Sequence, residues 1–130
     1  MNGKLFLLFV LIFTLSACTT SPGVVENFKP IPGSAENGAV SYEKDVFPIL
    51  MGSCWKCHGG EKISREFDMT TYASLMKGSK NGPQVISGDS ANSGIIISMV
   101  NGKMPKQGRK MFPEEIELIQ RWIDEGAKNN

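Results

Sequence analysis

The sequence predicts an all-α domain made of mostly short helices. Apolar residues recur at helical spacing in four stretches, and residues typical of helix ends flank these stretches. No strand-rich run precedes the pair of cysteines near the middle of the chain. The four predicted helices span residues 41–51, 70–77, 90–101 and 113–125.

The helix predicted over 41–51 begins after a capping residue, Ser41, and carries two acids in its first turn. Pro48 lies inside it. Because proline lacks the backbone donor and clashes with the preceding turn, we expect a kink or a break there. Gly52 is expected to end the helix. Its predicted apolar face consists of Tyr42, Val46, Phe47, Ile49 and Leu50.

The two middle helices end at glycines, Gly78 after the helix over 70–77 and Gly102 after the helix over 90–101. Three consecutive isoleucines in the second of them also suit a strand, which leaves that alternative open. Polar loops are predicted ahead of the two helices, over 61–68 and 79–89. The residues predicted to be buried are Tyr72, Leu75 and Met76 in the first helix, and Ile95, Ile96, Met99 and Val100 in the second.

The helix over 113–125 has the strongest pattern. Pro113 suits the first helical position, two glutamates occupy the first turn, and Gly126 suits the end. Its residues at helical spacing are Ile116, Ile119, Trp122 and Ile123.

The segment Cys54-Trp55-Lys56-Cys57-His58 is the centre of the chain's chemistry. Two cysteines held two residues apart and followed at once by a histidine are typical of covalent haem attachment, in which the thiols add to the vinyl groups and the imidazole binds iron. One short turn places both sulfurs under an edge of the macrocycle and the imidazole beneath the metal. We therefore predict one covalent haem c, held by Cys54 and Cys57, with His58 as an iron ligand.

Two other interpretations of this motif remain. The two thiols would also suit a redox-active dithiol of the thioredoxin kind, or a zinc site that includes His58. A zinc site needs a fourth ligand, and the chain has no other histidine and only one other cysteine, Cys18. A thioredoxin-like site should open a helix inside a βαβ unit, for which the sequence before Cys54 offers no strand. Haem is therefore the favoured interpretation.

His58 is the only histidine, which excludes ligation of the iron by two histidines of one chain. We predict Met104 as the second iron ligand. It lies in a loop between two predicted helices, Pro105 stiffens that loop, and the 46 residues that separate it from His58 suffice to pass around the ring. Met111 is the second candidate, and the other methionines of the domain are assigned to the core. Alternatively, Met104 touches the haem without binding iron.

The first 17 residues are typical of a secretory signal, with a basic start, an apolar run over 5–15 and small residues behind it. The apolar run is too short to span a bilayer as a helix, which needs about 20 apolar residues. It ends in Leu15-Ser16-Ala17-Cys18, which resembles the lipobox of bacterial lipoproteins. This resemblance implies cleavage before Cys18 and lipidation of that cysteine. The alternative is an ordinary signal peptide with a chance cysteine at the cleavage point.

We therefore predict a signal peptide over 1–17, a lipidated cysteine with a flexible tether rich in Pro and Gly over 18–40, and a folded domain over 41–130. The lipid would anchor the protein to a membrane of the bacterial cell envelope, facing the periplasm or the exterior. Without Lys4, 13 basic and 13 acidic side chains remain, a balance that argues against a nucleic-acid binder. No disulfide is expected, because all three cysteines are otherwise used.

Several short motifs occur in order along residues 41–128. They are Val46-Phe47-Pro48-Ile49-Leu50, Cys54-x-x-Cys57-His58-Gly59, Gly88-Asp89, Lys103-Met104-Pro105 and Trp122-Ile123-Asp124-Glu125-Gly126-Ala127. Together they resemble class I-type cytochromes c, and more closely the planctomycete-type cytochrome c domain. The resemblance implies about four helices around one haem, crossing of the first and last helices, and His58 and Met104 on opposite haem faces. Phe112-Pro113 departs from it, because such domains commonly offer Ser or Thr there to cap the last helix.

An iron atom held by His58 and Met104 has no vacancy for a substrate, so we expect an electron carrier between redox proteins and not an enzyme. The alternative is a haem peroxidase or a small-gas-binding domain with a labile sixth ligand. Four basic residues near the second ligand predict an acidic partner, unless they are merely solvated loop charges. They are Lys103, Lys106, Arg109 and Lys110.

Overall fold

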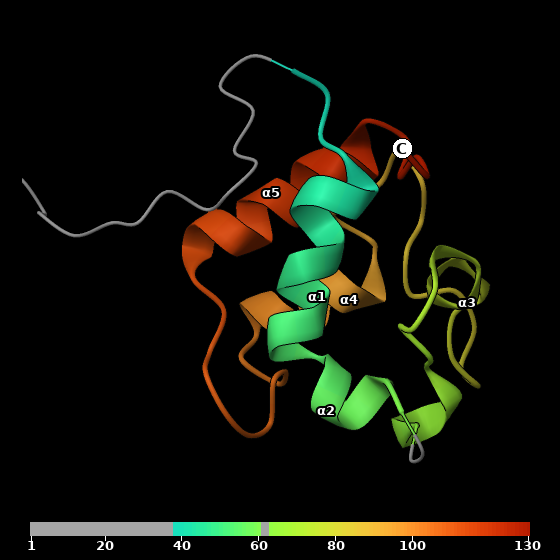
Figure 1. Cartoon of the computed structure of the whole chain (residues 1–130), viewed down its shortest axis with the longest axis vertical. Helices are drawn as coiled ribbons and strands as arrows, with labels where there is room; N and C mark the ends of the chain where they lie inside the picture. Colours follow the sequence, from blue (N-terminus) through green and yellow to red (C-terminus); the bar gives the residue numbers. More distant parts are fainter. Residues whose placement is uncertain (1–37, 61–62) are drawn as a thin grey trace, which may run out of the picture.

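The structure, a computed structural model, describes residues 38–60 and 63–130 and is all-α in these ranges, as predicted (Figure 1). They contain five α-helices, one π-helix and one 3-10 helix, and no β-strand. The elements are η1 (π, Tyr42–Val46), α1 (Phe47–Ser53), α2 (Trp55–His58), η2 (3-10, Ser64–Glu66), α3 (Tyr72–Lys77), α4 (Gly94–Val100) and α5 (Pro113–Asp124). None of these helices is long and apolar enough to cross a membrane.

The predictions for the N-terminal part are outside the described residues. These are the signal peptide over 1–17, lipidation of Cys18, and the tether apart from its last three residues. Val40, at the end of the predicted tether, is buried, and its N–H donates to the Glu125 carboxylate at 2.8 Å. The part of the chain that the structure describes therefore packs from just before Ser41.

The first helical segment consists of two elements, η1 and α1. Ser41 caps η1 as predicted, and its hydroxyl accepts the N–H of Lys44 at 3.3 Å. The N–H of Val46 bonds to the carbonyl of Ser41, five residues back, at 3.2 Å. Pro48 lies in the first turn of α1, a position that suits proline. The predicted break thus takes the form of a change from π- to α-helix, and α1 ends one residue beyond Gly52.

The two ends of the domain meet, because η1 packs against α5 (Figure 1). Asn130 takes part in four of the bonds that join the two ends. Its carbonyl oxygen accepts the Ser41 hydroxyl at 2.7 Å and the N–H of Glu43 at 3.1 Å. The first and last helices therefore cross, as the family resemblance implied.

An aromatic cluster forms the centre of this crossing. The ring centroid of Tyr42 lies 5.4 Å from that of Trp122 and 5.2 Å from that of Tyr72. The Trp122 indole donates to the carbonyl of Lys128 at 2.9 Å, and the Tyr72 hydroxyl donates to the carbonyl of Ala127 at 2.7 Å. The core at this end of the domain is therefore closed by its own side chains.

The later helices follow the predictions with local differences. α3 begins at Tyr72 with Thr71 as its cap, and Gly78 ends it with a φ of 85°. A single 3-10 turn, η2, interrupts the predicted loop over 61–68. The predicted helix over 90–101 is reduced to α4, and the open strand alternative is not realised. Its buried residues are Ile95, Ile96 and Met99.

Two residues were wrongly assigned to the core, because 63% of Val100 and 39% of Met51 are exposed. Val100 lies at the edge of the buried stripe in the last turn of α4, where no element of the described ranges covers it. The prediction for the last helix is confirmed from Pro113 to Asp124. In place of a Ser or Thr cap, the Glu115 carboxylate accepts the N–H of Phe112 at 2.9 Å.

Candidate functional site

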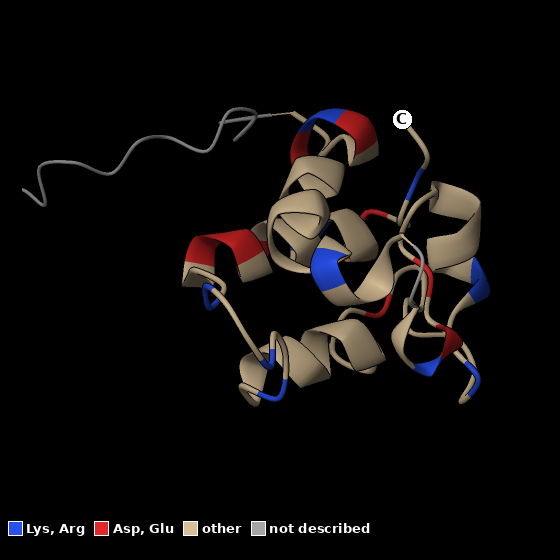
Figure 2. Cartoon of the chain, turned by 60° about the horizontal axis from the view of Figure 1, so that its bottom comes forward, with Lys and Arg blue, Asp and Glu red and all other residues tan. Residues whose placement is uncertain are grey.

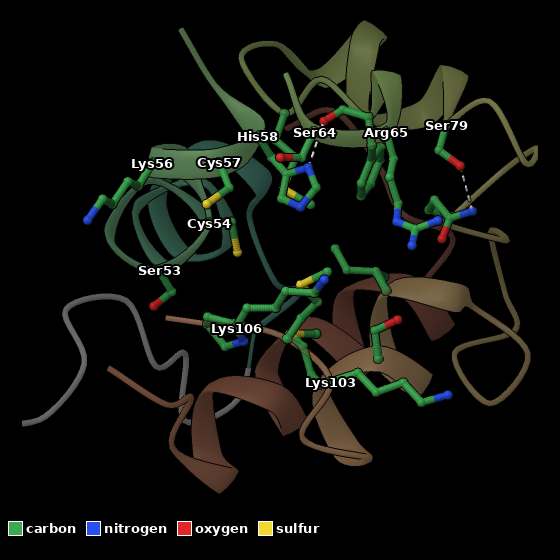
Figure 3. Close-up of a pocket in the computed structure, with 18 of the residues that line it drawn as sticks. Ser53, Cys54, Lys56, Cys57, His58, Ser64, Arg65, Ser79, Lys103 and Lys106 are labelled. Carbon is green, nitrogen blue, oxygen red and sulfur yellow. Dashed lines mark hydrogen bonds between the residues drawn. The ribbon is translucent and has the colours of Figure 1, made fainter. Parts of the chain in front are cut away.

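A cavity of about 830 Å³ lies at the other end of the domain. In Figure 3, Cys54, Cys57 and His58 lie on one side of it, and Lys103 and Lys106 lie on the other. Because these two lysines flank Met104-Pro105 in the chain, the loop over 103–107 forms the wall that faces His58. The volume falls within the roughly 300–1,000 Å³ of typical ligand pockets.

A single turn of chain presents the three residues of the motif, as predicted. Cys54 joins α1 to α2, and its N–H continues the ladder of α1 to the carbonyl of Leu50 at 2.8 Å. The N–H groups of Cys57 and His58 then bond back to the carbonyl of Cys54 at 3.1 and 3.0 Å. All three side chains line the cavity.

His58 is buried, and a backbone carbonyl contacts its ring on the side away from the cavity. Its Nδ1 lies 3.0 Å from the carbonyl oxygen of Phe67, whose ring stands edge-on to the imidazole at 5.4 Å between centroids. A neutral imidazole donates Nδ1–H to this carbonyl and keeps the lone pair of Nε2 for a metal. The ring points into the cavity (Figure 3).

The environment of Cys54 argues against a redox dithiol. Burial raises the pKa of the Cys54 thiol to about 11, and the negative charges of Glu115 and Cys57 add to this effect. Redox-active thiols have a lowered pKa, because the thiolate is the reactive form. A zinc site would need a fourth ligand, and the described residues supply none. No group of three or more His, Cys, Asp or Glu side chains in residues 38–60 and 63–130 is arranged to hold a metal ion.

Met104 lies in the wall opposite His58. It is half-buried, and its N–H donates to the carbonyl of Ser98 in α4 at 3.0 Å. Pro105 beside it is buried. Both residues line the cavity, whereas Met111, the second candidate, does not. The loop that carries Met104 is therefore attached to α4.

Two further methionines, Met69 and Met99, also line the cavity. Sequence reasoning assigned both to the core. Both are indeed buried, but they lie where the core meets the cavity. Met99 replaces Met111 as the alternative to Met104. The helical spacing of apolar residues predicted that Met99 is buried, but it could not show that Met99 borders a cavity.

A polar group at one end of the cavity was not anticipated from the sequence. Arg65, Ser79 and Gln84 line it there, and the Gln84 amide donates to the Ser79 hydroxyl at 3.1 Å (Figure 3). Apolar side chains line much of the rest of the cavity, among them Phe67 and Ile95. Two thiols, one cavity-facing imidazole, apolar walls and a polar end suit a flat, largely apolar macrocycle with acidic substituents.

An all-α domain with two thiols and an imidazole on one turn above an apolar cavity is typical of a c-type cytochrome. Residues 54–108 match the model of the planctomycete cytochrome C family. The match confirms the family resemblance over residues 54–108. It is consistent with a cytochrome c-type domain of planctomycete type. The match implies covalently bound haem c and suggests a haem-binding electron-transfer role. No curated protein and no solved structure matches the chain.

Proposed function

We propose that the protein is a monohaem c-type cytochrome that carries single electrons, with His58 and Met104 as axial ligands. One observation carries this proposal: the cavity has the attachment motif on one wall and the Met104 loop on the other. When bound, haem c supplies reversible one-electron chemistry, and a thioether ligand raises its reduction potential.

The chain contributes attachment, orientation and exclusion of water. Cys54 and Cys57 would hold the group covalently, and the Phe67 carbonyl orients His58 for binding through Nε2. The hydrogen bond from the Met104 N–H to the Ser98 carbonyl would keep this ligand near the cavity in either oxidation state. Because the ligands do not have to move, little reorganisation accompanies electron transfer.

The proposed partner is a redox protein with an acidic surface. Lys56, Lys103 and Lys106 are exposed and line the cavity (Figure 3). Figure 2 shows the basic segment ahead of α5 beside the acidic first turn of that helix. Lys56 joins the lysines expected at this site, whereas Arg109 and Lys110 bond within the protein. We name the set Lys56, Lys103 and Lys106 the lysine rim.

The proposed location is a membrane of the bacterial cell envelope, with the lipid on Cys18 as the anchor. The support for it is the sequence Leu15-Ser16-Ala17-Cys18 alone. A chain held in this way would reach partners on the same membrane surface or in the space next to it.

A pyridine haemochrome spectrum combined with a redox titration tests the function. We expect one haem c per chain, a six-coordinate spectrum in both oxidation states and a single one-electron wave. A five-coordinate ferrous spectrum would favour the alternative, a peroxidase or a gas-binding domain with a labile sixth ligand. Protein without any haem absorption would exclude both functions.

A further inference from the structure

Arg109, in the loop that carries Met104, keeps 45% of its side chain exposed and contacts the first turn of α5 through its guanidinium. Its guanidinium forms two hydrogen bonds to the Glu115 carboxylate, at 2.8 Å each. The same group donates to the Ser53 hydroxyl at 3.1 Å. Ser53 directly precedes Cys54, so Arg109 connects the loop to both α5 and the haem-attachment turn.

Lys110 bonds to the loop itself. Its ammonium group donates to the carbonyl of Pro105 at 2.7 Å and to that of Gly102 at 3.2 Å. These carbonyls lie on either side of Met104 in the chain. The ammonium therefore closes the loop around Met104, and an uncharged side chain of similar length would leave both carbonyls to water.

Glu115 is the fixed end of this arrangement. It is buried in the first turn of α5 and also accepts the N–H of Phe112 at 2.9 Å. The guanidinium carbon of Arg109 lies 4.8 Å from the centre of the Phe112 ring, within the range of a cation–π contact. A carboxylate bonded by a guanidinium and a backbone N–H has one preferred geometry, because a bidentate pair restricts both direction and distance.

We infer that Arg109 and Lys110 are positioning residues that hold Met104 against the cavity. This inference rests on the proposed function, in which Met104 binds the iron. Neither Arg109 nor Lys110 lines the cavity. Their effect acts through the loop, because Arg109 fixes its end to α5 and the attachment turn and Lys110 fixes its curvature.

The test is competition between Met104 and an added ligand in the full-length, haem-loaded protein. Imidazole binds ferric haem only when the methionine leaves, so its affinity reports how firmly the methionine is held. Loss of a charged hydrogen-bond partner should raise imidazole affinity by about tenfold, in Arg109→Gln and in Lys110→Met. Arg109→Lys, which keeps the charge but not the bidentate geometry, should give an intermediate value.

A matched control is Lys44→Met, which alters an exposed lysine of η1 and should leave the affinity unchanged. The decisive comparison uses Met104→Ala as background. There Arg109→Gln and Lys110→Met should no longer change imidazole affinity, because no methionine remains to be held. An equal effect in both backgrounds would show a general disturbance of the pocket and would overturn the inference.

The inference and the proposed function fail in different ways. If Met104→Ala leaves the methionine-to-iron absorption band intact, the ligand assignment is wrong and the inference fails with it. If that band is lost but Lys110→Met and Arg109→Gln bind imidazole as the wild type does, only the inference fails. Lys110→Met serves alone if Arg109→Gln does not fold.

Discussion

His58 and Phe67 are joined by a hydrogen bond between the imidazole Nδ1 and a backbone carbonyl oxygen, at 3.0 Å. The carbonyl fixes both the tautomer and the direction of the ring, which leaves the lone pair of Nε2 for iron. The N–H of Met69 donates to the carbonyl of His58 at 2.8 Å, which ties the same segment to α2 a second time. The proximal side of the site is therefore formed by the protein fold itself.

Covalent attachment is the first prediction. Protein made with a haem-attachment system should have the mass of one added haem, and the haem should remain after acid-acetone extraction, because thioether bonds survive acid. Cys54→Ala and Cys57→Ala should each leave at most one thioether, and the double variant should release all haem. Complete extraction of haem from the wild-type protein would contradict the assignment.

The second prediction concerns Met104. Met104→Ala should abolish the far-red methionine-to-ferric-haem band and lower the reduction potential, because a soft ligand that favours ferrous iron is lost. Met111→Ala should do neither, since Met111 does not line the cavity. Met99→Leu keeps the apolar volume of a buried residue and tests the remaining alternative. Loss of the band in Met99→Leu, with Met104→Ala unchanged, would exchange the two assignments.

The features predicted correctly from the sequence depend on local signals. Pro113 and Gly126 mark the limits of α5, and Ser41 marks the beginning of η1. The spacing of the motif over 54–58 predicted a single turn of chain, because haem attachment requires both thiols and the imidazole on the same side. These features need only neighbouring residues, so they can be read along the chain.

The features that were missed depend on contacts between distant segments. The acceptor for His58 is a backbone carbonyl, which every residue has and which no side-chain pattern reveals. Arg109 and Lys110 were counted as free charges of a loop, because a basic residue looks the same in sequence whether it faces water or Glu115. Val100 has the helical spacing of the buried residues of α4, but this spacing does not show which part of the helix other elements cover.

The pH dependence of stability gives the third prediction. Burial alone would raise the pKa of Glu115, but hydrogen bonds from Arg109 and from the N–H of Phe112, with the charge of Arg109, outweigh it and lower the pKa below the ordinary 4.5. The folded protein thus binds this proton more weakly than the unfolded chain. The stabilising contribution is complete above the unfolded value and is lost as the pH falls through the folded one.

Urea unfolding at about pH 7 and at successively lower pH measures this contribution. Glu115→Gln should lower the free energy of unfolding by about 1–3 kcal/mol at neutral pH and by less in acid, because the carboxylate hydrogen bonds are lost. Glu114→Gln, an exposed neighbour, should have little effect at either pH. An equal loss at all pH values would show that the carboxylate charge is not what stabilises the loop.

Membrane anchoring is the fourth prediction. Cys18→Ala should prevent lipidation, and detergent phase partitioning should then move the cleaved cytochrome from the membrane to the soluble fraction. A single acyl chain holds a protein only marginally, so loss of the whole lipid group should release it. Cleaved Cys18→Ala protein that stays with the membrane would contradict the lipoprotein interpretation.

The fifth prediction concerns the lysine rim of Lys56, Lys103 and Lys106. Positive charges around the cavity should steer an acidic partner into productive encounters, which raises the association rate more than the final affinity. Because exposed charges are screened over about 10 Å at 0.1 M salt, the electron-transfer rate with an acidic partner should fall as salt rises. The rate with a basic partner should not fall.

Reversal of the rim charges provides the comparison. Lys56→Glu, Lys103→Glu and Lys106→Glu in one protein should slow the reaction with the acidic partner on the order of tenfold at low salt and remove its salt dependence. The control changes net charge equally at exposed lysines that do not line the cavity, through Lys44→Glu, Lys77→Glu and Lys128→Glu. If both triple variants slow the reaction to the same extent, net charge and not the rim governs the encounter. If stopped-flow rates are indifferent to salt with both partners, steering is excluded, because an electrostatic encounter cannot be independent of screening.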